Sequence, residues 1–155
     1  MGKTEYEKAK EIVLQNRGKS RFVGLRSSTL LEKAEQVLGL TFPQTYRSFL
    51  ADFGAGNFGS FEVYGVVDAD FENSSVPDAI WFTLTERREA NLPFNLVVIG
   101  DAGTGELYCL ELGTQTEGRI ILLDPGRITE VTKDQIVAED FGAYFLERVQ
   151  RQLRR

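Results

Sequence analysis

Residues 35–50, EQVLGLTFPQTYRSFL, are the most informative part of the sequence. They predict one helix that ends at Gly39, a tight turn, and a second helix that begins at Pro43, since glycine commonly ends a helix and proline suits a first turn. Apolar residues at the spacing of one helical face follow the proline and predict a buried stripe. These residues are Tyr46, Phe49, Leu50 and Phe53. The stretch holds no reactive group, so it predicts a scaffold and names no chemistry.

Helices are predicted before this stretch and strands after it. Thr29 and Glu32 have the spacing of a capping box, which would begin the helix that ends at Gly39. Alternating apolar and polar residues with short turns indicate strands in the second half, with one short helix around Trp81 between them. The expected helices cover about residues 6–16, 29–38, 43–53 and 134 or 140 onward, and the short middle helix follows Ser75 and Pro77 and ends before Leu92. The expected strands cover residues 58–67, 96–99, 106–112 and 119–123.

Short turns between consecutive strands cannot carry the crossovers that a parallel sheet needs. We therefore expect an α+β fold in which N-terminal helices are followed by a mainly antiparallel sheet, with a mixed sheet as the alternative. Helices flank this sheet, and a C-terminal helix closes the fold. The chain has 155 residues, 42% of them hydrophobic, with no Pro- or Ser-rich linker and no internal repeat. A single domain over residues 1–155 is expected.

Composition excludes several kinds of chemistry. The sequence has no histidine and one cysteine, Cys109. These counts exclude Ser-His-Asp and Cys-His catalysis, imidazole metal sites, a zinc–thiolate cluster and internal disulfides. We therefore expect no catalytic residue, no metal and no cofactor, and a carboxylate-based enzyme is the least favoured alternative. The polar start MGKTEYEKAKE and the lack of a long apolar run predict a cytoplasmic protein that does not associate with membranes.

The net charge of −5 hides a strong segregation. Residues 1–59 carry nine Lys or Arg and six Asp or Glu, whereas residues 60–140 carry five Lys or Arg and sixteen Asp or Glu. An acidic middle segment repels nucleic acid and attracts a basic protein. The alternative is that these carboxylates only keep the surface soluble.

The densest acidic group lies in the loop that precedes the short middle helix. We expect its exposed carboxylates to contact a partner, with Trp81 as an aromatic anchor. The segment DAGTGE, residues 101–106, lacks the lysine of a phosphate loop and has too few carboxylates for a calcium loop. It therefore predicts a hairpin turn with exposed acidic ends. The candidate partner-binding residues are Asp68, Asp70, Glu72, Asp78, Trp81, Asp101, Glu106 and Glu117.

Several motifs, taken in order, resemble the SUKH superfamily, which includes bacterial immunity proteins, SecY-interacting Syd-like proteins and fungal cell-wall assembly regulators. The resemblance continues from the helical stretch into IGDAGTGELY, residues 99–108, and covers about residues 29–149. Leucine is usual in the family where this chain has Phe42. The matching residues are Glu35, Leu38-Gly39, Phe42-Pro43, Tyr46, Phe49-Leu50, Gly54-Ala55-Gly56 and Asp140-Phe141.

The resemblance implies an α+β fold and a non-enzymatic binding role. In this superfamily the role is most often neutralisation of a polymorphic toxin delivered between competing bacteria, and such toxins are frequently nucleases with basic clefts. The resemblance therefore implies an immunity protein that binds a cognate, basic protein toxin. A scaffold module of the cell-wall-regulator type, with no toxin partner, is the alternative. We expect a monomer or a weak homodimer.

Overall fold

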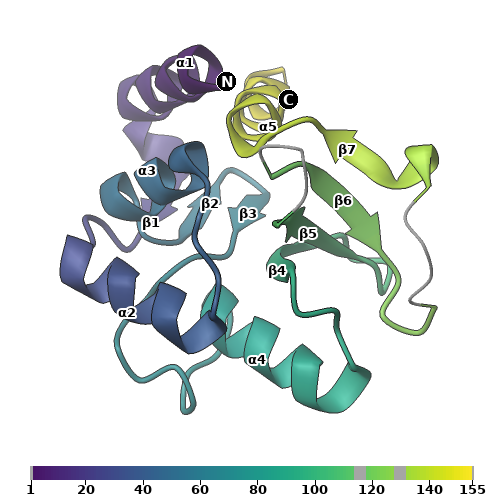
Figure 1. The fold of residues 1–155 in the computed structure, drawn as a ribbon. Coiled ribbons are helices and arrows are strands. Elements are labelled where there is room, and N and C mark those ends of the chain that lie inside the picture. The colour runs from purple at the N-terminus through teal and green to yellow at the C-terminus, as the bar shows by residue number, and fades with distance from the viewer. Residues whose placement is uncertain (1, 114–117, 128–131, 155) are drawn as a thin grey trace.

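The computed structural model describes residues 2–113, 118–127 and 132–154 (Figure 1). Within them it has five α-helices, two short 3-10 helices and seven strands. The helices are α1 (Lys3–Gln15), α2 (Ser28–Leu38), α3 (Gln44–Asp52), α4 (Ala79–Ala90) and α5 (Phe141–Leu153), with η1 (Arg17–Lys19) and η2 (Lys133–Gln135). The strands are β1 (Ser20–Phe22), β2 (Gly56–Phe58), β3 (Phe61–Val63), β4 (Leu96–Asp101), β5 (Leu107–Glu111), β6 (Ile120–Leu123) and β7 (Ile136–Ala138).

The strands form two antiparallel sheets, β1-β2-β3 and β4-β5-β6-β7, in which strands that follow each other in the chain are neighbours. The backbone N–H of Tyr64, just after β3, donates to the carbonyl of Ile99 in β4 at 2.8 Å, so the two sheets meet there. The expected α+β fold with mainly antiparallel pairing and a C-terminal helix is confirmed.

One predicted strand is wrong. The alternation over residues 58–67 predicts a continuous strand, but the chain turns back within it. Gly59 takes a positive φ of 61°, and Phe58 of β2 pairs with Phe61 of β3. Because only glycine adopts this backbone conformation freely, Gly59 is the local cause of the break.

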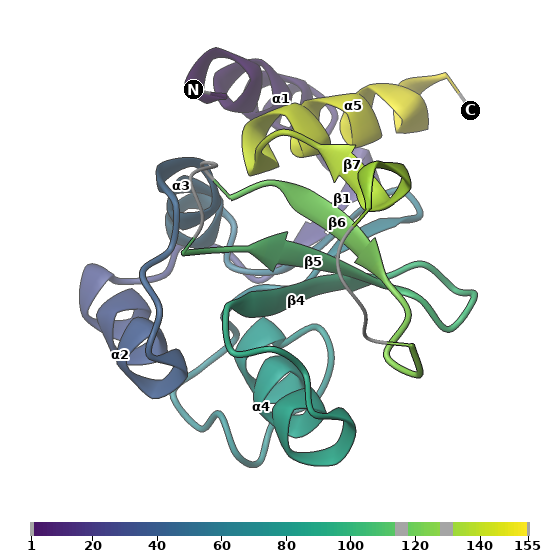
Figure 2. The same ribbon diagram turned by 45° about the vertical axis from the view of Figure 1, so that its right-hand side comes forward.

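Figure 2 shows the β4–β7 sheet between helical layers. The helices α1 and α5 lie side by side on one side of this sheet, and α4 lies on the other side against β4. The helix α2 contacts both α3 and α4. Apolar side chains from these helices and from both sheets form one core cluster.

The apolar stripe predicted in α3 is buried, as expected. Its residues are Tyr46, Phe49, Leu50 and Phe53. The ring of Phe49 packs against Phe141 and Phe145 of α5, with ring centroids 5.4 and 5.3 Å apart. The hydroxyl of Tyr46 donates to the carbonyl of Tyr64 at 2.9 Å. The helix α3 therefore joins α5 to the end of β3.

The start of α2 differs from the prediction. The helix begins after Ser27, whose hydroxyl accepts a hydrogen bond from the Leu30 N–H at 3.2 Å. The prediction that Thr29 and Glu32 form a capping box at the start of this helix is therefore wrong. Three hydroxyl residues follow each other at this point, and each of them has the chemistry of a helix cap.

Candidate partner-binding surface

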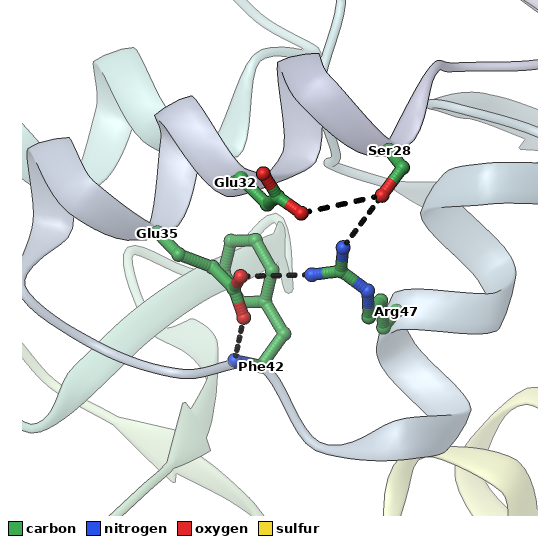
Figure 3. Close-up of polar contacts among 5 residues, drawn as sticks. All are labelled: Ser28, Glu32, Glu35, Phe42 and Arg47. Carbon is green, nitrogen blue, oxygen red and sulfur yellow. Dashed lines mark hydrogen bonds and ion pairs between the residues drawn. The ribbon is translucent and has the colours of Figure 1, made fainter.

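Glu35 links α2 and α3, the two helices of residues 35–50 (Figure 3). One oxygen of its carboxylate accepts from the Phe42 N–H at 2.7 Å, and the other accepts from the Arg47 guanidinium at 2.8 Å. A second Arg47 nitrogen donates to Ser28 Oγ at 3.4 Å, and Ser28 Oγ donates to Glu32 at 3.5 Å. The Glu35 carboxylate is thus committed to the junction of α2 and α3, which agrees with a scaffold role for this stretch.

The loop between β3 and α4 carries three exposed carboxylates. Asp68 Oδ1 accepts from the Asp70 N–H at 3.0 Å, and Asp70 Oδ1 accepts from the Asn73 N–H at 3.3 Å. Phe71, which follows Asp70 in the chain, is buried in the core. The loop is therefore anchored from inside while Asp68, Asp70 and Glu72 remain exposed.

Asp78 belongs to the interior and not to this exposed surface. Its side chain is fully buried, and one carboxylate oxygen accepts from the N–H groups of Ile80 and Trp81 at 2.8 and 3.1 Å. Burial raises the pKa of Asp78, and the hydrogen bonds that it accepts oppose the increase. An aspartate before an apolar run fits a surface loop as well as a helix cap, and the structure assigns Asp78 as the N-cap of α4.

Trp81 lies in the first turn of α4 and is half-buried. Its ring centroid is 6.0 Å from that of Phe82, whose ring lies 5.4 Å from Tyr64. Phe82 packs against the core, and both side chains keep part of their surface exposed. Asp68 is near enough to Asp78 for repulsion to contribute to the raised pKa of Asp78, so the acidic loop passes close to the start of α4.

The predicted hairpin turn is present between β4 and β5. Asp101 Oδ1 accepts from the Gly103 N–H at 2.7 Å, and Thr104 Oγ1 donates to Glu106 Oε1 at 3.1 Å. Asp101 is exposed and Glu106 is half-buried. These contacts are those of a tight turn stabilised by its own side chains.

A carboxylate that was not among the predicted site residues, Glu62, lies beside Asp101. It is exposed on β3 between the buried residues Phe61 and Val63. Partial loss of hydration raises the pKa of Glu62, and repulsion by Asp101 raises it further. Alternation in the sequence indicates that Glu62 faces outward. No local pattern indicates that β3 and β4 lie next to each other.

The exposed carboxylates of this surface therefore fall into two groups. Asp68, Asp70 and Glu72 share the loop before α4, while Asp101 meets Glu62 where β3 and β4 approach each other. Glu117, the last of the predicted residues, lies outside the described residues.

Among the residues that the structure describes, no three His, Cys, Asp or Glu are placed to hold a metal ion. The thiol of Cys109 is buried, and burial raises its pKa, which disfavours the nucleophilic thiolate. Within the same described ranges, no helix is long and apolar enough to cross a membrane. Exposed negative charge is the main chemical feature that the two acidic groups offer to a partner.

The fold and the surface together define a small α+β domain with a helical scaffold and acidic loops. The chain belongs to the SMI1-KNR4 cell-wall family, SUKH_5, whose model matches residues 6–150, and this confirms the predicted superfamily. Its fold is similar to that in a crystal structure of a protein from Pseudomonas syringae pv. tomato. The two chains are 19% identical with a TM-score of 0.57, over 80% of this chain and 89% of that chain. At this identity the likeness concerns the fold alone.

Proposed function

We propose that this protein is a non-enzymatic immunity protein that binds and neutralises a cognate polymorphic bacterial toxin of the nuclease class. The observation that carries the proposal is unneutralised negative charge. In the described part of the chain, none of the exposed carboxylates of Asp68, Asp70, Glu72 and Asp101 forms an ion pair with Lys or Arg. Membership of the SUKH superfamily supports a binding role of this kind.

An acidic surface is complementary in charge to a basic cleft. A nuclease cleft attracts phosphates and is therefore basic, so an acidic protein surface accelerates encounter with it and covers it. The same charge disfavours nucleic acid as a partner. We expect an interface of standard size, about 1,600 Å² in total, formed by a monomer or a weak homodimer in the cytoplasm.

The second candidate is a scaffold module that binds host proteins with no toxin involved. The description of the matching family as a cell-wall family favours this candidate. Gene order separates the two: an upstream gene for a large secreted toxin supports immunity, and its absence supports the scaffold role.

Co-expression with the C-terminal domain of that toxin tests the proposal directly. We expect restored growth and a stable complex on size exclusion. Unchanged toxicity together with no complex would sink the immunity role.

Charge reversal tests the surface. Replacing Asp68, Asp70 and Glu72 by lysine should slow association with the toxin domain by about tenfold at low salt and flatten its salt dependence.

The matched control reverses three exposed glutamates on the helical side of the molecule, Glu7, Glu11 and Glu32, which changes the net charge equally. Equal effects of the two triple variants would show that only the net charge acts, and that the loop is not part of the contact.

A further inference from the structure

A groove of about 600 Å³ lies where α1, β1 and the end of α3 meet. Its lining is partly apolar and includes Phe22, whose ring centroid is 5.0 Å from that of Phe53. Leu14 of α1 and Val23, just after β1, line the same groove, and each is 43% exposed. Exposed apolar side chains gathered around a hollow are typical of a surface that receives a partner.

The strand that lines this groove has a free edge. β1 is the outer strand of the β1-β2-β3 sheet, and in the described part of the chain no strand pairs with its other side (Figure 1). The Lys19 carbonyl accepts from the Gly59 N–H at 2.8 Å, and the Val23 N–H donates to the Ala55 carbonyl at 2.9 Å. Successive residues of a strand present their backbone groups to opposite sides, so the N–H and carbonyl of Phe22 face the free side.

This edge is basic, although the protein as a whole carries a net charge of −5. Arg17, Lys19 and Arg21 are exposed, and none of them forms an ion pair with an Asp or Glu among the residues that the structure describes. Asp52, a carboxylate that lines the groove, is already paired with Lys10 at 3.2 Å. Three positive charges therefore remain for a partner to neutralise.

We propose that an extended acidic segment of a protein partner adds to the free edge of β1 as a further strand. This inference goes beyond the proposed function, because it assigns a second surface whose partner is acidic. Side chains of an added strand alternate between two faces. Those beside Phe22 would lie in the apolar groove, and those beside Arg21 would bring carboxylates to the cations. A polypeptide fits this edge because its backbone offers N–H and carbonyl groups at the spacing of a strand.

Charge on a short edge strand has a second use in proteins, which is to prevent pairing with other chains. In that case no added strand should bind, whatever its charge. The exposed side chains of Leu14 and Val23 argue against this use here, because apolar surface beside the edge favours association.

Titration of the ¹⁵N-labelled full chain with the acetylated and amidated hexapeptide EVEVEV tests the proposal. Because no toxin is present, the result does not depend on the immunity role. With excess peptide we expect hydrogen exchange of the Phe22 amide to slow by at least about tenfold, since its N–H gains a carbonyl partner. The Val23 amide is the internal control, because it is already bonded to Ala55. An unchanged Phe22 amide at millimolar peptide would overturn the proposal.

N-methylation of the peptide distinguishes strand addition from contact by side chains alone. Only one edge of an added strand faces β1, so methylation of one alternate set of three N–H groups should abolish binding. Methylation of the other set should leave binding intact, because those groups point away from β1. Equal effects of the two methylated peptides would overturn the proposal.

The acidic character of the partner is tested by removing charge from either side. The variant R17Q/K19Q/R21Q should bind EVEVEV about tenfold more weakly at low salt, because three exposed ion pairs are lost. The neutral peptide QVQVQV should bind the native chain with a similar loss.

The matched control K33Q/R88Q/K133Q removes the same charge from exposed positions that do not line the groove. We expect its affinity for EVEVEV to change less than threefold, since screening weakens distant charges. Equal losses in the two triple variants would show that only net charge acts, and would overturn the proposal.

A second copy of this chain is the competing occupant, because its own loop of Asp68, Asp70 and Glu72 is acidic and exposed. Without peptide, protection of the Phe22 amide that rises with protein concentration would overturn the proposal in favour of self-association. Exchange at Phe22 that stays fast at every concentration, together with protection by EVEVEV, supports the proposal.

Discussion

At the scale of single residues, Glu35 illustrates a charged side chain used for architecture. The variant E35A leaves the Phe42 N–H without its acceptor and Arg47 without its ion-pair partner. We expect the free energy of unfolding to fall by about 2 kcal/mol, measured by urea denaturation. E32A removes a nearby exposed carboxylate whose contact with Ser28 is long, and we expect a change within about 0.5 kcal/mol. Similar losses in both variants would contradict a special role for Glu35.

Glu62 gives a prediction about pH. The folded state raises the pKa of its carboxyl, so the ionised form is less favourable in the folded than in the unfolded chain. At neutral pH this lowers stability, and the loss disappears as pH falls through the folded pKa and the carboxyl takes up a proton. We therefore expect E62Q to be more stable than the native chain at pH 7, by about 0.5 kcal/mol since solvent screens an exposed group.

The pH dependence distinguishes this effect from a packing change. Thermal unfolding of E62Q and of the native chain should converge below pH 4, near the ordinary pKa of a glutamate. A gain that persists in acid would indicate that the charge of Glu62 is not its cause.

At the scale of elements, the end of α2 depends on Gly39. Its φ is 71°, and a Cβ added there would lie 2.7 Å from the ring of Phe94, which also stacks under Arg87 at 4.2 Å. G39A should therefore combine backbone strain with displacement of Phe94 and lower the free energy of unfolding by about 2 kcal/mol. Urea denaturation measures this loss.

Gly103 provides a matched control. Its φ is 81°, but a Cβ there would meet no atom within 4 Å. G103A should therefore show the backbone strain alone, about 1 kcal/mol. The double variant G39A/F94A tests the role of Phe94. The loss in free energy of unfolding that G39A causes, measured against F94A alone, should lie closer to the loss in G103A than it does in the native chain. An unchanged loss would show that Phe94 is not involved.

Some elements and element ends could be predicted from the sequence, and others could not. The stripe from Tyr46 to Phe53 and the turn at Gly39 depend on contacts between near neighbours, and both are present. The reversal at Gly59 breaks an alternating pattern that continues on both sides of it, so the pattern alone predicts one strand.

The candidate site depends on long-range packing, which local patterns do not contain. Glu62 and Asp101 lie on different strands and come together only because β3 packs beside β4. Asp78 is the opposite case, a carboxylate predicted to be exposed that the structure buries. It follows the acidic loop in the sequence, but the helix that begins after it takes it into the interior.

At the scale of the whole molecule, the two sheets share one apolar core. We therefore expect them to unfold together in one cooperative transition. Native-state hydrogen exchange tests this, because backbone amides bonded in the β1–β3 sheet and in the β4–β7 sheet should show the same maximal free energy of opening. A sheet that opens at a clearly lower free energy would divide the chain into two stability units.

The position of Trp81 has a practical consequence. It is the one tryptophan of the sequence, and it lies half-buried in the first turn of α4, the helix that follows the loop of Asp68, Asp70 and Glu72. Indole fluorescence responds to the polarity around the ring. A partner that covers the start of α4 would remove water from this indole and move its emission to shorter wavelengths. The protein thus carries an intrinsic optical reporter, and a tryptophan-free ligand can be screened against it without any label.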